Sequence, residues 1–165
     1  MIKVLTSEES QSIWKKIRSI VLKDLDYYKF FIGSAKDVSQ LGRDIGLEKI
    51  EFISITRNSI NGYFSYIYDS NTRTAKGFEM LSFEKDKYKN IIFLKDFAEV
   101  IKCLHESPDY ERLEVEIIES APSMSILEHL VKLGTFRKVG EKHKCIRLND
   151  NKLYDVLIYE HLKEV

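Results

Sequence analysis

The feature that most constrains the fold is a period-two alternation of apolar and polar residues between positions 49 and 84. Three such runs, KIEFISITR, GYFSYIYD and AKGFEMLSFE, are separated by the short polar segments NSIN and DSNTRT. Alternation of this kind is typical of strands that bury one face, and short connections join antiparallel neighbours. The sequence therefore predicts an antiparallel meander of three strands.

Two amphipathic helices with a strand between them follow this meander. The first helical stripe consists of Phe93, Leu94, Phe97, Ala98, Ile101 and Leu104. The strand is LEVEIIE, and the second helix is MSILEHLVKL, which ends before a C-terminal capping glycine at Gly134. A crossover helix returns the chain in its original direction, so residues 77–83 and 113–118 are predicted to be adjacent parallel strands in an otherwise antiparallel sheet.

The ends of the chain add further elements. Residues 1–5 form a short alternating run, and Thr6 with Glu9 has the spacing of a capping box, which predicts a helix start. The segments TFRKVG, KHKCIRL and KLYDVLIYEHL are predicted to close the chain as three strands. Residues 26–48 are the least legible part, with an aromatic run and a weak helical pattern broken by glycines.

Composition limits the classes of protein that the chain can represent. At 165 residues it fits one domain over residues 1–165. Basic and acidic residues both number 26, so no net charge draws nucleic acid or an anionic membrane from a distance. We find no leader-like start, no membrane-length apolar run and no cysteine framework around Cys103 and Cys145, so we expect a cytoplasmic protein.

Two stretches resemble a known family. SAPSMSILEHLVKLGTFRKVGEKH followed by NKLYDVLIYE is similar to the C-terminal part of the GCN5-related N-acetyltransferase (GNAT) superfamily, and INGYFSYIYD is similar to that family's third strand. The resemblance covers about residues 49–163. It implies a three-layer α+β fold: a central mixed, mostly antiparallel sheet with a splayed parallel strand pair, flanked by helices. It also implies acetyl-CoA as co-substrate.

The resemblance assigns a cofactor site to the splayed strands and the helix starts after them. The strands would be Phe78 to Phe83 and Leu113 to Ile118. Main-chain groups near Leu81 or Ser82 would stabilise the oxyanion, a pyrophosphate would bind the loop from Lys87 to Ile92, and the helix N-terminus there suits an anion. The residues assigned to acetyl-CoA are Leu81, Ser82, Phe83, Lys87, Tyr88, Lys89, Asn90, Ile91, Ile92 and Ser123.

This sequence departs from the family in the phosphate loop and at two further positions. Asn90 and Ile92 stand where the phosphate loop usually carries small residues, and a β-branched residue impedes close backbone approach to phosphate. Ala121 stands for an asparagine that usually contacts the cofactor. Leu130 stands for a tyrosine that protonates the leaving thiolate in many members.

Direct acyl transfer needs a base and an acid as well as the oxyanion site. Glu79 and Glu119, on and after the splayed strands, are the candidate bases, although exposed strand carboxylates without a catalytic role are commoner. Tyr154 or Tyr88 could replace the missing acid, although packing tyrosines are commoner. The four histidines show no metal-ligand spacing, so no metal site is expected.

Two functions remain open at this point. One is an acyl-CoA-dependent N-acetyltransferase that acts on an amine of a small molecule or peptide. Nucleic acid is not expected as an acceptor, except for the amino acid of an aminoacyl-tRNA. The other is a catalytically inactive binding or regulatory module of the same fold that has lost acetyl-CoA binding. No membrane association is expected, and a homodimer is compatible with the resemblance.

Overall fold

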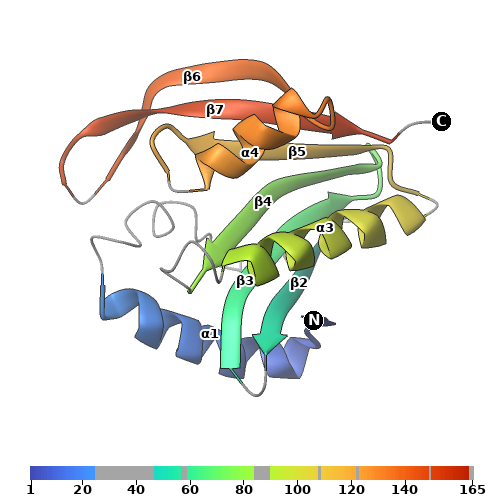
Figure 1. Cartoon of the computed structure of the whole chain (residues 1–165), viewed down its shortest axis with the longest axis vertical. Helices are drawn as coiled ribbons and strands as arrows, with labels where there is room; N and C mark the ends of the chain where they lie inside the picture. The colour runs from blue at the N-terminus through green and yellow to red at the C-terminus, as the bar shows by residue number, and fades with distance from the viewer. Residues whose placement is uncertain are drawn as a thin grey trace.

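The computed structural model describes residues 1–24, 47–56, 59–83, 90–107, 109–121, 123–148 and 150–163. In these residues a seven-stranded sheet has the order β1-β2-β3-β4-β5-β7-β6 (Figure 1). Its strands are β1 (Ile2–Val4), β2 (Leu47–Thr56), β3 (Ser59–Asp69), β4 (Thr74–Ser82), β5 (Arg112–Ile118), β6 (Arg137–Arg147) and β7 (Leu153–Leu162). The described helices are α1 (Ser7–Leu22), α3 (Asn90–Glu106) and α4 (Met124–Lys132). None of them is long and apolar enough to cross a membrane.

The predicted meander is confirmed. Strands β2, β3 and β4 pair antiparallel, with Glu51 opposite Ser65 and Ser65 opposite Glu79. β4 then pairs parallel with β5, after the chain has crossed over through α3. The sheet is therefore mixed and mostly antiparallel, with one parallel pair, as the resemblance implies.

The C-terminal part contains two strands where the sequence predicts three. Most of TFRKVG and of KHKCIRL belongs to one long strand, β6, which pairs antiparallel with β7. Register shifts after Lys138 and after Lys142 interrupt the ladder. Lys144 has a φ of 46°. Such irregularities place extra residues in a strand without ending it, and they blur the period-two pattern that the prediction used.

Local signals set the start of α1 and the end of α4 as predicted. The Thr6 hydroxyl accepts from the N–H of Glu9, whose carboxylate accepts in turn from the N–H of Thr6, so the capping box is formed. At the end of α4, Gly134 has a φ of 74° and donates to the Val131 carbonyl, while Thr135 donates to that of Leu130. This pair of bonds is the Schellman motif, in which glycine is favoured because it has no Cβ to clash.

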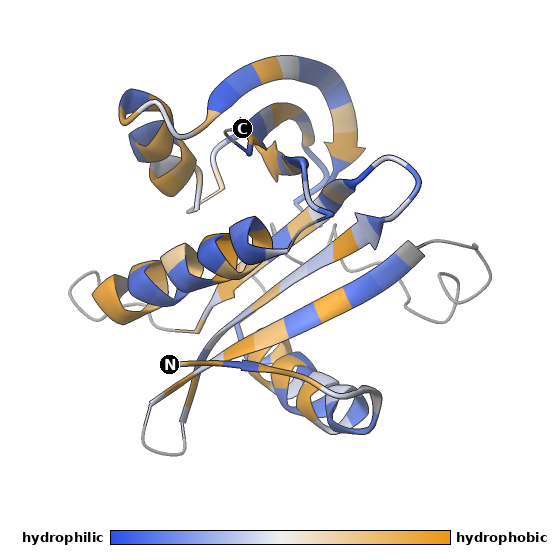
Figure 2. Cartoon of the chain, turned by 90° about the vertical axis from the view of Figure 1, so that its right-hand side faces the viewer, coloured by the Kyte–Doolittle hydropathy of each residue, from blue (hydrophilic) through white to orange (hydrophobic). Residues whose placement is uncertain are grey.

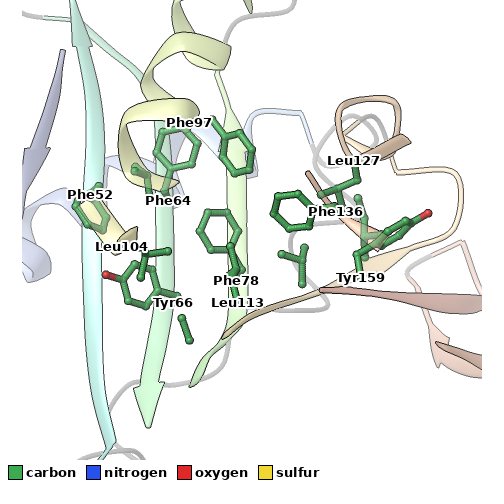
Figure 3. Close-up of a cluster of buried hydrophobic side chains, with 14 of the residues drawn as sticks. Phe52, Phe64, Tyr66, Phe78, Phe97, Leu104, Leu113, Leu127, Phe136 and Tyr159 are labelled. Carbon is green, nitrogen blue, oxygen red and sulfur yellow. The ribbon is translucent and has the colours of Figure 1, made fainter. Parts of the chain in front are cut away.

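Helices cover both faces of the sheet (Figure 2). On one face, residues of α3 and α4 pack on the sheet in the main core, where Phe97 lies between Phe64 and Phe78 with ring centroids 6.1 and 5.6 Å away (Figure 3). On the other face, Ile17 and Val21 of α1 pack on Ile53, Tyr63 and Leu81. Alternate residues of the same strands thus serve two separate cores.

Gly62, in the INGY segment, allows α3 to lie close to β3. A Cβ at this position would lie 2.4 Å from ring atoms of Phe93 and 2.8 Å from the carbonyl oxygen of Leu81. We expect Gly62→Ala to lower the free energy of unfolding by about 1 to 3 kcal/mol, because overpacking forces the ring or backbone to move. Urea unfolding would measure the loss. Gly140→Ala is the matched control, because its nearest contact would be an ordinary 3.4 Å to Ile158; equal losses at both sites would contradict this explanation.

Candidate functional site

The site is organised by the divergence of the two parallel strands. Bridged pairs between the described residues of β4 and β5 are Thr74 with Arg112 and Ala75 with Leu113, which lie at the start of each strand. Figure 1 shows the two ribbons separating from that end. The carboxyl ends of β4 and β5 are therefore the open end of a splayed pair.

Backbone pairing with β3 determines which peptide groups face the splay. The N–H of Phe83 donates to the Asn61 carbonyl at 2.8 Å, and Gly62 lies opposite Ser82. Because peptide groups alternate in direction along an antiparallel strand, Leu81 and Phe83 direct theirs to β3, whereas Ser82 and Met80 direct theirs to the β5 side. Of the two expected oxyanion positions, this alternation favours Ser82.

The α3 helix begins after the open end of β4. Lys87, Tyr88 and Lys89 lie outside the described residues, as does the whole segment 84–89. Asn90 is the first residue of the helix, and Ile91 and Ile92 follow in its first turn with exposures of 52% and 40%. The bulky Ile92 is thus helical and partly exposed at the turn where the resemblance places the phosphate.

The α4 helix begins after the open end of β5. Ser123 occupies its N-cap position without a side-chain capping bond. Nearby, Ala121 is buried in the main core, and Leu130 packs against the same core. These two side chains, which the resemblance aligns with an asparagine and a tyrosine, are thus core residues.

Glu79 lies on β4 two residues before Leu81, on the face that α1 covers. Its Oε2 accepts a hydrogen bond of 2.9 Å from the hydroxyl of Ser65, which is fully buried. This bond holds the carboxylate of Glu79, which projects from β4 at the border of the splay, against Ser65 of β3. Glu79 is therefore a carboxylate with a defined position, as a general base requires.

The other two catalytic candidates are held elsewhere on the sheet. Glu119 follows the last residue of β5, is exposed, and donates its main-chain N–H to the Asp155 carbonyl at 2.8 Å. Tyr154, on β7, packs with Ile118 and Leu148, and its hydroxyl donates to Asp150 at 2.5 Å. The Asp150 bond engages the proton that Tyr154 would have to donate as an acid.

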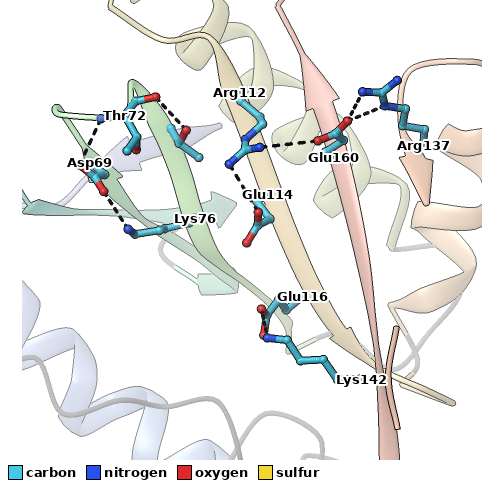
Figure 4. Close-up of polar contacts among 10 residues, drawn as sticks. Asp69, Thr72, Lys76, Arg112, Glu114, Glu116, Arg137, Lys142 and Glu160 are labelled. Carbon is cyan, nitrogen blue, oxygen red and sulfur yellow. Dashed lines mark hydrogen bonds and ion pairs between the residues drawn. The ribbon is translucent and has the colours of Figure 1, made fainter. Parts of the chain in front are cut away.

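The face of β5 and β7 that points away from α4 carries several ion pairs. Arg112 lies 3.8 Å from Glu114 and 4.0 Å from Glu160, which also pairs with Arg137 (Figure 4). Lys142 of β6 pairs with Glu116 at 2.5 Å. Charged side chains on this part of the sheet are thus paired with one another.

A buried carboxylate that the sequence did not single out lies between α1 and the sheet. Glu51 of β2 accepts hydrogen bonds from the indole Nε1 of Trp14 at 2.8 Å, from the hydroxyl of Tyr63 at 2.5 Å and from the hydroxyl of Ser10. Burial by itself raises the pKa of Glu51, but these three bonds and the Lys49 charge outweigh it and lower the pKa below its ordinary value. The side chain is therefore an anion.

Two histidine arrangements also emerge only from the fold. The Nε2 atoms of His105 and His161 contact each other, and Nδ1 of His161 donates to the Thr135 carbonyl at 2.6 Å. On the β6–β7 hairpin, Nδ1 of His143 lies 3.3 Å from Glu141 and 3.2 Å from Asp155. Ligand atoms of these last three residues are close enough to hold a metal ion, which the spacing of the histidines in the sequence did not predict.

Comparisons with known proteins agree with this geometry at the level of the fold. The sequence matches no family model and no curated protein. A Streptococcus mutans protein, smu.2055, superposes with a TM-score of 0.64 at 17% identity over 99% of both chains. RimL, a ribosomal alpha-N-protein acetyltransferase in complex with coenzyme A, gives 0.66 at 13% identity over 98% of this chain and 93% of that chain.

A third solved structure is that of the microcin self-immunity acetyltransferase MccE in complex with acetyl-CoA and AMP. It superposes with a TM-score of 0.54 at 19% identity and covers 71% of this chain. The match spans 61% of the MccE chain, less than two thirds of its length. From the strand order, the splayed parallel pair and these superpositions, the chain has the fold of the GCN5-related N-acetyltransferases.

Proposed function

We propose that this protein is an acyl-CoA-dependent N-acetyltransferase that transfers an acetyl group from acetyl-CoA to an amine by direct attack. The observation that carries the proposal is the splay of β4 from β5, with Ser82 and Met80 directing peptide groups to the β5 side. Two proteins of the same fold are described with coenzyme A or acetyl-CoA bound. The proposed cofactor residues are Leu81, Ser82, Phe83, Lys87, Tyr88, Lys89, Asn90, Ile91, Ile92 and Ser123.

When bound, acetyl-CoA supplies an acyl carbon activated as a thioester. In the proposed reaction Glu79 takes a proton from the acceptor ammonium, directly or through water, so that the nitrogen can attack the acyl carbon. The new C–N bond forms as the C–S bond breaks, and the leaving thiolate takes up the second proton, which the attacking nitrogen loses as it becomes an amide. The N–H of Ser82 is the proposed donor to the oxyanion, where a pre-positioned dipole stabilises charge as it develops.

The second candidate is a binding module of the same fold without catalysis. It is favoured by the burial of Ala121 and the packing of Leu130, because neither side chain can replace the polar group that the family uses there. On the side of β5, Ser123 remains a proposed contact of acetyl-CoA and Glu119 a proposed alternative base. Binding of acetyl-CoA separates the two functions.

The experiment concerns the 87–92 segment. If this segment binds a pyrophosphate despite Ile92, the binding energy comes from peptide N–H groups, the helix dipole and the ammonium groups of Lys87 and Lys89. We expect Lys87→Ala combined with Lys89→Ala to weaken acetyl-CoA binding about tenfold or more, because each exposed ammonium–phosphate contact contributes roughly 1 kcal/mol. Isothermal titration calorimetry at low and high salt would measure the change and its screening.

Two further variants make the result interpretable. Lys15→Ala with Lys16→Ala removes the same charge from exposed positions of α1 and should leave binding unchanged. Ile92→Gly should strengthen binding if backbone approach is limiting, at a cost of about 1 kcal/mol in helix stability. Acetyl-CoA binding that is absent from the wild type at millimolar concentration and is not restored by Ile92→Gly would sink the enzyme proposal.

A further inference from the structure

The ammonium group of Lys49 lies between a carboxylate and two aromatic rings on the α1 face of the sheet. Its Nζ lies 3.4 Å from Oε1 of Glu51, 5.0 Å from the centroid of the Trp14 ring and 5.9 Å from that of Tyr63. The two rings form adjacent walls, with centroids 5.2 Å apart and planes inclined by 65°. The side chains of Lys49 and Glu51 are 10% and 9% exposed, so this ion pair is largely buried.

These contacts define a chemical class of ligand. A carboxylate and two aromatic faces within about 6 Å of a cation are the elements with which proteins recognise ammonium groups, and the attraction increases when water is excluded. The walls are rigid, because Trp14 and Tyr63 are each hydrogen-bonded to the carboxylate between them. The site demonstrably accepts a primary ammonium on an unbranched alkyl stem, since the lysine side chain is one.

The position of this site connects it to the splay. Glu51 lies opposite Ser65, and Ser65 lies opposite Glu79, so the two carboxylates stand at the ends of one cross-strand row. Two strand spacings separate them, about 10 Å. The buried hydroxyl between them donates to Glu79. A short chain carrying two amines could therefore place one at the Glu51 site and the other beside Glu79.

We propose that Glu51, Trp14 and Tyr63 form a binding subsite for a linear alkylammonium group of the acceptor, and that Lys49 fills this subsite until the acceptor displaces it. The role in acceptor binding rests on the acetyltransferase function proposed above. The ammonium binding itself does not, because it requires neither acetyl-CoA nor turnover. The ligand chemistry is shared by aliphatic diamines and by lysine side chains of peptides.

Trp14 provides a direct readout, because it is the single tryptophan of the chain. Replacement of the Lys49 ammonium by that of the ligand changes the groups that contact the Trp14 ring, so titration with pentylammonium or diaminopentane should change its emission in a saturable way. The neutral isostere pentanol and sodium chloride at matched ionic strength serve as blanks. A lysine with blocked α-amine and carboxyl groups tests the peptide source against the diamine.

Three variants test the assignment of residues. Lys49→Ala removes the internal competitor and should raise the affinity for pentylammonium and diaminopentane about tenfold. Glu51→Gln should lower both affinities at least tenfold, because a neutral amide replaces the anion. Lys76→Ala is the matched control, because it also removes a strand lysine that is paired with a carboxylate, Asp69 at 2.8 Å. The Lys76 side chain is 42% exposed and lies outside the proposed subsite, so this variant should change neither affinity.

The proposal is overturned if wild-type protein shows no saturable response to any of the ammonium probes, or if pentanol binds Lys49→Ala as tightly as pentylammonium does. Should Lys49→Ala fail to fold, the wild-type titration still decides. Loss of acetyl-CoA binding together with intact ammonium binding refutes the transferase and leaves the subsite standing. Acetyl-CoA binding without ammonium binding refutes the subsite alone.

Discussion

Phe97→Ala is expected to lower the free energy of unfolding by about 3 to 5 kcal/mol, the range for removing a buried aromatic ring. The ring is 3% exposed and lies between Phe64 and Phe78, on the face of α3 that covers the sheet. Its removal leaves a cavity that the two flanking rings, which are themselves packed in the same core, can fill only in part. Chemical denaturation followed by circular dichroism would measure the loss.

Leu127→Ala extends this test to α4. This leucine is fully buried in the same core, and we expect a loss of about 2 to 5 kcal/mol. Leu133→Ala is the matched control, because Leu133 is 63% exposed at the end of the same helix and should change stability by less than about 0.5 kcal/mol. Losses below that value at both buried sites would mean that the helix faces are wrongly assigned.

Glu79→Gln is expected to reduce kcat of acetyl transfer by about 10² to 10⁴-fold, the usual contribution of a general base. The amide keeps the size of the side chain and can still accept a hydrogen bond from Ser65, so folding should be preserved. The measurement is thiol release from acetyl-CoA with diaminopentane or other primary amines as acceptors, recorded across a pH series. Loss of the acidic limb of the pH profile would identify the missing base.

Glu48→Gln gives the control for this variant. Glu48 is an exposed carboxylate on β2 and should leave both the rate and the pH profile as in the wild type. A decrease of less than about threefold in Glu79→Gln would remove Glu79 from the reaction. Glu119, at the end of β5, would then be the next carboxylate to replace.

Much of the fold follows from local sequence signals. Period-two alternation between residues 49 and 84 specified the meander, because a half-buried strand must place its apolar side chains on one face. The Thr6–Glu9 capping box and Gly134 fixed helix ends through bonds to residues a few positions away. The predicted division of β6 into two strands was wrong, because shifts in its register with β7 hide the alternation.

The candidate site depended on the tertiary structure to a greater degree. Alternation put Lys49 and Glu51 on one face of a strand and Tyr63 and Ser65 on one face of the next, and so limited which side chains could meet. It could not show that Glu51 lies opposite Ser65, that Trp14 of α1 reaches them, or that Ser82 rather than Leu81 directs its peptide group to the β5 side. A periodic pattern records only which side of a strand is buried. Neighbours across a sheet are set by register, and register is decided by turns, bulges and packing between segments far apart in the chain.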